Sequence, residues 1–250
     1  MKNLMKEKLK KNQLVLGSWI TITNPEVVEI LSLNDFDWFL FDMEHAPITV
    51  VQLEEMLMAI SKTITPVVRI PRNELVYVKQ ALDVGGHGIM VPMVNNVEEA
   101  KNAVSFSKYP PMGIRGTGAR RASSYFTEHN EYLKTSNEET LVIVQIETKE
   151  AVENFESIIS VEEVDGWFVG PNDLAASLGH LGDPTSIVVL EAMDKMLKIS
   201  ENVGKPGGTL SFDIKQAKNF IKKGFKIMAV GSDDFFLYQS AKALLGKLLD

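Results

Sequence analysis

Two carboxylates follow apolar runs at a spacing that would bring them together. Glu147 comes directly after LVIVQI (141–146), and Asp173 comes directly after GWFVGPN (166–172). Such runs are typical of strands buried on both faces, and the helix-length segment between them predicts neighbouring parallel strands. Both carboxylates should therefore lie at carboxyl ends of adjacent strands, where α/β proteins place their binding crevices. Oxygen ligands without Cys or His suit an octahedral divalent cation that keeps positions for water and substrate.

Two polar residues interrupt apolar strands near the same ends. Arg69 lies within VVRIP (67–71), and Gln145 lies two residues before Glu147, so Gln145 and Glu147 point to the same side of their strand. A buried arginine or glutamine needs a hydrogen-bonding partner. A metal-bound anionic ligand would be such a partner. The alternative is a salt bridge at the rim between Arg69 and the carboxylates.

His45 follows Asp42 by three residues at the end of another predicted strand, 38–44. We expect the Asp42 carboxylate to accept a hydrogen bond from one ring nitrogen, which would leave the other nitrogen basic. A histidine with a reference pKa of about 6.5 and this orientation suits a general base. The alternative is a capping or surface histidine. One interpretation of Glu44 is that it faces outwards.

The elements that would position these residues alternate between strand and helix. Strands are predicted at 14–20, 38–44, 66–70, 88–94, 141–146, within 166–172, and at 205–212 and 225–232, each followed by a helical pattern. Eight such units without a linker favour one TIM-barrel domain over residues 1–250 rather than an open doubly wound sheet. The longest irregular segment, 109–126, holds three glycines, two prolines and three arginines, as functional loops often do.

The composition excludes several classes of protein. The chain has 250 residues, no cysteine and a formal net charge of -7, which argues against nucleic acid as a partner and against a disulfide framework. No apolar run approaches the roughly 18 to 20 residues that span a bilayer, so no membrane partner is expected. The basic start lacks the apolar core of a signal peptide, and a cytoplasmic location is the expectation.

Seven motifs, in order over nearly the whole chain, resemble one family. They are FDMEHAP (41–47), VVRIP (67–71), LDVGGHGIMVPMV (82–94), YPPMGIRG (109–116), VQIET (144–148), VGPNDLAASLG (169–179) and FKIMAVGSD (225–233). Their order and spacing are similar to those of the HpcH/HpaI aldolases, the class II metal-dependent pyruvate aldolases that include 4-hydroxy-2-oxoheptane-1,7-dioate aldolase. The resemblance implies a TIM barrel with a divalent metal cofactor, magnesium, manganese or cobalt.

The resemblance also implies which residues bind metal and substrate. Glu147 and Asp173 match the two metal ligands of the family. Gln145 and the main chain at Asn172 and Asp173 match groups that hold the pyruvate unit. Trp19 lies in the family's GSW motif beside the acceptor.

A second set of matches implies the catalytic residues. Arg69 matches the residue that stabilises the enolate oxygen, and His45 matches the acid/base. Asp42 and Asp83 match carboxylates that orient this histidine or raise its basicity.

The implied activity is reversible cleavage of a 4-hydroxy-2-oxo acid to pyruvate and an aldehyde through a metal-bound enolate. The same chemistry would serve an oxaloacetate-type decarboxylase, and a non-catalytic barrel that binds a carboxylate is a further alternative. Arg115, Arg120 and Arg121 either bind a distal carboxylate of the substrate or tie their loop to a neighbouring subunit.

The last helical segment is apolar over more than one stripe, which favours packing on another subunit as well as on its own barrel. Its apolar residues include Phe235, Phe236, Leu237, Leu244, Leu245, Leu248 and Leu249. We therefore expect a homo-oligomer. The resemblance implies a hexamer with this helix at an interface.

Overall fold

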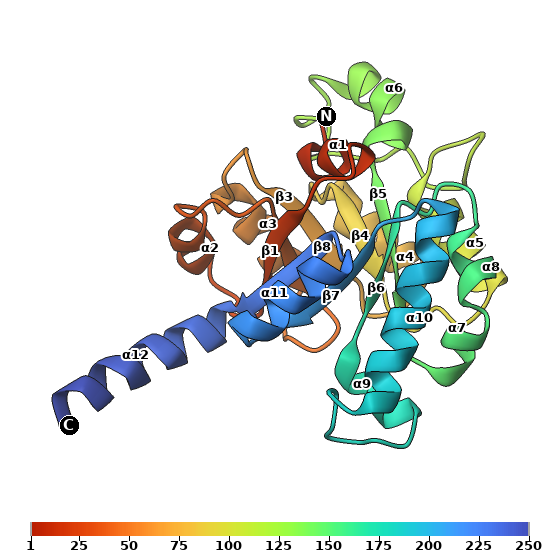
Figure 1. Cartoon of the computed structure of the whole chain (residues 1–250). Helices are drawn as coiled ribbons and strands as arrows, with labels where there is room; N and C mark the ends of the chain where they lie inside the picture. The colour runs from red at the N-terminus through yellow and green to blue at the C-terminus, as the bar shows by residue number, and fades with distance from the viewer. Residues whose placement is uncertain (1, 250) are drawn as a thin grey trace.

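Eight parallel strands close into a barrel in the order of the chain, from β1 to β8 and back to β1. The computed structural model describes residues 2 to 249 (Figure 1). The strands are β1 Val15–Ile20, β2 Trp38–Asp42, β3 Thr65–Arg69, β4 Gly88–Val91, β5 Leu141–Ile146, β6 Gly166–Val169, β7 Gly207–Ser211 and β8 Ile227–Ser232. This confirms the predicted TIM barrel.

Helices follow the strands and surround the barrel, and further helices lie at both of its ends. They are α1 Leu4–Lys10, α2 Pro25–Leu31, α3 Val50–Ala59, α4 Leu75–Asp83, α5 Val97–Ser107, α6 His129–Glu139, α7 Lys149–Glu153, α8 Phe155–Ile159, α9 Pro171–Ser177, α10 Ile187–Val203, α11 Ile214–Lys223 and α12 Asp233–Leu249. The single helix expected between β5 and β6 is two short helices, which meet at Asn154. In Figure 1, α1 and α6 lie at one end of the barrel and α9 at the other.

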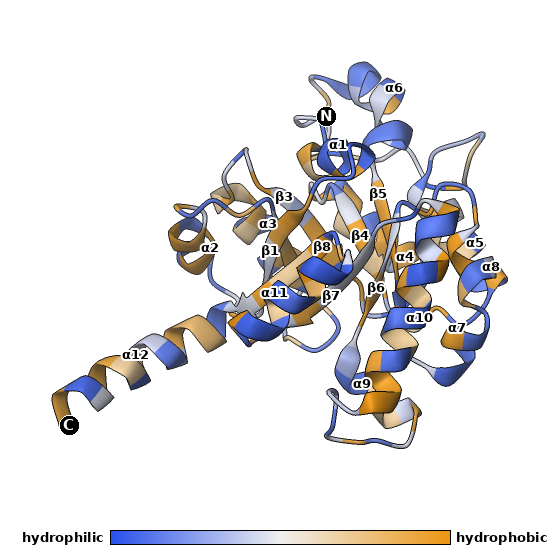
Figure 2. Cartoon of the chain, in the orientation of Figure 1, coloured by the Kyte–Doolittle hydropathy of each residue, from blue (hydrophilic) through white to orange (hydrophobic). Residues whose placement is uncertain are grey.

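Apolar side chains fill the barrel and the layer between barrel and helices. Inside it, the ring of Trp19 lies 6.3 Å from that of Trp38 and 5.3 Å from that of Phe168, measured between centroids. From α1, Met5 and Leu9 join the same cluster and close the amino-terminal end. Helix α11 shows hydrophilic residues on its outer face, whereas α12 carries many hydrophobic ones (Figure 2). The open end is therefore the carboxyl-terminal one, where the strands deliver their polar residues.

The last helix, α12, leaves the barrel and projects into solvent (Figure 1). Its large apolar side chains are exposed, Leu248 to 80% and Leu244 to 64%. No helix within residues 2–249 has the length and apolar character needed to cross a membrane.

Candidate active site

Three polar side chains converge around Gly170 at the carboxyl ends of β5 and β6. A methyl group placed on Gly170 would lie 2.9 Å from Oε2 of Glu147, 3.0 Å from Nε2 of Gln145 and 3.8 Å from Oδ2 of Asp173. Glu147 directly follows β5, and Asp173 lies in the first turn of α9, which begins just after β6. The two carboxylates predicted from their spacing are thus neighbours, and glycine is the residue that leaves room between them.

Glu147 is held in a fixed orientation and is almost fully buried, with 3% of its surface exposed. Its Oε1 accepts a hydrogen bond of 2.8 Å from the main-chain amide of Met93, and its Oε2 accepts one of 2.6 Å from Gln145. Burial, with the neighbouring carboxylates of Glu44 and Asp173, raises the pKa of Glu147 to about 7. A buried carboxylate crowded by other carboxylates is stabilised by a cation.

A buried ion network lies beside these carboxylates, at the ends of β2 and β3. Arg69 ends β3 and is 6% exposed. Its guanidinium donates to both oxygens of Asp42, and its Nη1 lies 3.2 Å from Oε2 of Glu44. The charge of Arg69 also acts on Glu147. Glu44 therefore faces the site, and the interpretation that it faces outwards is wrong; burial raises its pKa above the ordinary value.

His45 sits at the mouth of the site rather than inside it, with 64% of its side chain exposed. The expected hydrogen bond from its ring to Asp42 is not formed. Asp42 accepts from Arg69 and from the main-chain amides of Glu44 and His45. The ring Nε2 lies 3.8 Å from Oε2 of Glu44, so Glu44 is the carboxylate nearest to the imidazole.

Two further predicted residues line the same end of the barrel. Trp19 is 7% exposed, and the guanidinium carbon of Arg69 lies 5.6 Å from its ring centroid. Asn172 is exposed in the first turn of α9. The first intrahelical hydrogen bond of α9 runs from Leu174 to Gly170, so the amides of Asn172 and Asp173 precede it and face a ligand-accessible end.

The donor set fits a hard divalent cation. Glu147 and Asp173 supply carboxylate oxygens, and the amide oxygen of Gln145 is buried without a hydrogen-bond partner. Within residues 2–249 no three His, Cys, Asp or Glu side chains are arranged to hold one metal ion. Two carboxylates that leave the other positions to water and substrate are the usual protein contribution to a magnesium site.

Asp83 and the arginine-rich loop lie at the other end of the barrel. Asp83 ends α4, which returns the chain to the amino end of β4, and it pairs with Arg115 at 2.7 Å. Arg121 donates to the main-chain oxygens of Val84 and Leu57. Within one chain, therefore, Asp83 does not meet His45, and these arginines do not reach a substrate at Glu147.

Sequence reasoning missed three contributors to the site. Glu44 was given no role, although it stands two residues after Asp42 at a strand end, the same signal that singled out the other polar residues. Gly170 precedes the Pro-Asn-Asp turn, where a glycine indicates a close approach. The amide of Met93 carries no signal in the sequence, because its use depends on how β4 and β5 pair.

The barrel, the pair formed by the buried Glu147 and the exposed Asp173, and the adjacent arginine fit an aldolase, an enzyme that makes and breaks carbon–carbon bonds. The chain belongs to the HpcH/HpaI aldolase/citrate lyase family, whose sequence profile matches residues 15–240. The resemblance seen in the motifs is thereby confirmed.

Individual relatives are similar over almost their whole length. The chain is 40% identical to a 5-keto-4-deoxy-D-glucarate aldolase of Escherichia fergusonii over 232 residues, 92% of this chain and 91% of that protein. A protein of the same name from Klebsiella pneumoniae is 39% identical over the same shares. Among solved structures, an HpcH/HpaI aldolase/citrate lyase family protein of Burkholderia cenocepacia has 32% identity and a TM-score of 0.96, with 100% of each chain covered.

A more distant solved structure shows the fold alone. The protein CitE of Mycobacterium tuberculosis, in complex with magnesium and acetate, has a TM-score of 0.64 at 14% identity, with 94% of this chain and 90% of that one covered.

Proposed function

We propose that this protein is a divalent-metal-dependent class II pyruvate aldolase that reversibly cleaves a 4-hydroxy-2-oxo acid to pyruvate and an aldehyde. The convergence of Glu147, Asp173 and Gln145 around Gly170 carries the proposal. The names of the relatives given above support 5-keto-4-deoxy-D-glucarate as the first substrate to test. Counted from its keto end, that molecule is a 4-hydroxy-2-oxo acid, and breaking the bond between its carbons 3 and 4 releases pyruvate and a hydroxylated aldehyde acid.

Glu147 and Asp173 would hold the cation, and Gln145 would hold the keto acid beside it. A divalent cation in this position supplies Lewis acidity toward the keto oxygen. Arg69 contributes a fixed positive charge where the enolate oxygen develops its negative charge. Because Arg69 is buried and already oriented by Asp42, it needs little reorganisation during the reaction.

His45 would move the protons. Its imidazole takes the proton of the 4-hydroxyl group, the bond between carbons 3 and 4 breaks, and the electron pair passes to the pyruvate fragment while the aldehyde leaves. Protonation of carbon 3 then completes pyruvate. The exposed position of the ring lets it exchange protons with solvent between turnovers, and Glu44 is the carboxylate nearest to it, at 3.8 Å.

One observation favours a second activity, decarboxylation of oxaloacetate-like acids. The ring of His45 is exposed and is not held by Asp42. Loss of carbon dioxide needs the same stabilisation of an enolate by Arg69 but no base for a hydroxyl group. A poorly held base would therefore handicap the aldolase and not the decarboxylase.

Pyruvate release by metal-stripped protein, with and without added magnesium, manganese or cobalt, tests the proposal. The substrates are 5-keto-4-deoxy-D-glucarate, other 4-hydroxy-2-oxo acids and oxaloacetate. We expect metal-dependent cleavage that is lost in His45→Ala and kept in His129→Ala, a matched change on α6 at the other end of the barrel. Oxaloacetate turnover that survives in His45→Ala without cleavage of any aldol would favour the decarboxylase. No turnover with any metal would overturn both.

A further inference from the structure

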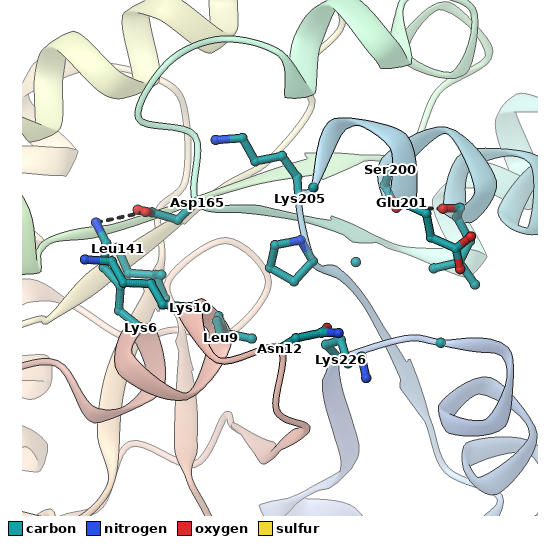
Figure 3. A pocket seen from close by; sticks show the side chains of 15 residues that line it. Lys6, Leu9, Lys10, Asn12, Leu141, Asp165, Ser200, Glu201, Lys205 and Lys226 are labelled. Carbon is teal, nitrogen blue, oxygen red and sulfur yellow. Dashed lines mark hydrogen bonds and ion pairs between the residues drawn. The ribbon is translucent and has the colours of Figure 1, made fainter.

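A cavity of about 630 Å³ lies at the amino-terminal end of the barrel. It is lined by α1, by the end of α10, and by the residues that lead into β6, β7 and β8 (Figure 3). Strand β6 separates it from the candidate active site, because Asp165 precedes this strand and Asp173 follows it. The cavity is therefore a different site from the one around Gly170.

Positive side chains outnumber negative ones around this cavity. Its charged residues are Lys6, Lys10, Lys205 and Lys226 together with Asp165 and Glu201. In Figure 3, Lys205 and Lys226 lie on opposite sides of the cavity, Lys6 and Lys10 lie on a third side, and Glu201 lies across from them. The chain as a whole carries a net charge of -7, so the excess of positive side chains around this cavity is opposite in sign to the net charge of the protein.

Two of the four ammonium groups have no anionic partner within residues 2–249, whereas Lys10 lies 3.5 Å from Glu138. Lys6 is 2.8 Å from Asp165, and this buried pair is neutral as a unit. Lys205 is half-buried and donates 2.5 Å to the main-chain oxygen of Val164, which carries no full charge. Lys226 is also half-buried, and although its main chain bonds to Gly207 and Val15, its ammonium group makes no hydrogen bond or ion pair within the described range 2–249. An ammonium group has three N–H donors, so Lys205 and Lys226 can each donate further hydrogen bonds to a bound anion.

We propose that this cavity binds a small anion with two or more negative charges, a polycarboxylate or a phosphate compound, held mainly by Lys205 and Lys226 with Lys10 at the rim. The volume lies in the range of small-molecule sites. Two lysines on opposite sides of a cavity can each contact one end of such an anion, because their four-carbon stems let the ammonium groups reach inwards. A singly charged ion could neutralise the charge of only one of the two ammonium groups.

Binding is tested by titration calorimetry of the metal-stripped protein with pyrophosphate, inorganic phosphate and citrate, each at one ionic strength set with sodium chloride. The variant is Lys205→Gln with Lys226→Gln. The matched control is Lys215→Gln with Lys218→Gln, which removes the same charge from the exposed face of α11. We expect the cavity variant to bind at least about tenfold more weakly and the control to bind as the wild type does.

The stronger ligand identifies the class of anion: pyrophosphate points to a phosphate compound and citrate to a polycarboxylate. Equal binding by the cavity variant and the wild type, or no binding of any of the three, would overturn the proposal. The single change Lys226→Gln keeps the test valid if the double variant is unstable, because this ammonium group makes no contact to lose. Pyruvate release measured on the same proteins should be unchanged, so the outcome is independent of the proposed aldolase activity.

Discussion

Arg69 donates two parallel hydrogen bonds to Asp42, from Nε to Oδ1 at 2.9 Å and from Nη2 to Oδ2 at 2.7 Å. The two residues are direct partners in the register of β2 and β3, so the pair is built into the sheet. A planar guanidinium held by two bonds has one orientation, and Nη1 is then directed to Glu44 at 3.2 Å. The position of the positive charge is thus determined before any substrate arrives.

Arg69→Lys should lower kcat/KM for pyruvate release by about 100-fold to 1000-fold, because a lysine cannot form the two-bonded pair and its charge would lie elsewhere. Circular dichroism should show the barrel intact. Arg72→Lys, an exposed arginine in the loop after β3, serves as the control and should retain near wild-type activity. Near wild-type activity in Arg69→Lys would show that orientation of the charge is unimportant.

Gly170→Ala should reduce activity while the protein remains folded. The backbone of Gly170 has a φ of -86°, which alanine adopts without strain, so the effect comes from the new methyl group. That group would lie about 3 Å from Glu147 and Gln145, which must shift. We expect kcat/KM to fall by at least about tenfold, since positioning errors of this size are costly in catalysis. Gly118→Ala, where the added methyl group meets nothing within 4 Å, is the control.

Glu147→Gln should weaken binding of manganese, followed by titration calorimetry, by at least about tenfold. An amide oxygen is a neutral ligand, whereas the buried carboxylate supplies charge to the cation. The metal-stripped variant should be no less stable than the wild type, because the change removes a buried negative charge that is crowded by Glu44 and Asp173. Glu150→Gln, on the exposed first turn of α7, should leave the affinity unchanged. Equal affinities in both variants would remove Glu147 from the metal site.

Stability should fall in mild acid because of His87, which lies just before β4. Burial, together with the positive charge of Arg121, lowers the pKa of this histidine from 6.5 to about 4. The unfolded chain therefore binds the proton first, and this part of the stability is complete above pH 6.5 and is lost as the pH falls toward 4. We expect a loss of about 2 kcal/mol between pH 7.5 and 4.5 that His87→Gln removes.

Urea unfolding at each pH measures this contribution as the difference between wild type and variant. His180→Gln provides the comparison at a histidine in the loop after α9. A wild-type and a His87→Gln protein with the same dependence on pH would refute the assignment.

The exposed apolar residues of α12 favour assembly of several chains. Light scattering should give the mass of an oligomer, with a hexamer expected from the family resemblance. Leu244→Glu with Leu248→Glu should reduce that mass, because both side chains are more than half exposed in the single chain. Leu33→Glu, at a side chain 84% exposed outside this helix, is the control. A monomeric mass for the wild type would contradict this prediction.

Local patterns in the sequence predicted most of the elements correctly. Asn24 caps α2 by accepting from the amide of Glu26 at 2.7 Å, as the Asn-Pro pair indicated. Asp213 caps α11 in the same way, and Gly224 ends this helix with a φ of 119°. Capping depends on residues a few positions apart, so it can be predicted without knowledge of the fold.

The hydrogen bonds between polar side chains of different strands were harder to predict from the sequence. Asp42 was expected to bind the ring of His45, three residues away, and instead binds Arg69 on the next strand. The short separation in sequence indicated the wrong partner for Asp42. The guanidinium of Arg69 lies directly opposite Asp42 in the register of β2 and β3 and can donate two hydrogen bonds to it. The position of Asp83 had a usable signal: a residue that ends the helix after β3 must lie near the amino end of β4.

The sequence by itself therefore determined the barrel and the meeting of Glu147 with Asp173. Alternating strands and helices close in only a few ways, and parallel strands deliver their carboxyl ends to the same side. The tertiary structure alone decided that Arg69 is held by Asp42 and Glu44, and that the amide of Met93 orients Glu147. Those contacts depend on strand register and burial, which set the positions of side chains that lie far apart in the chain.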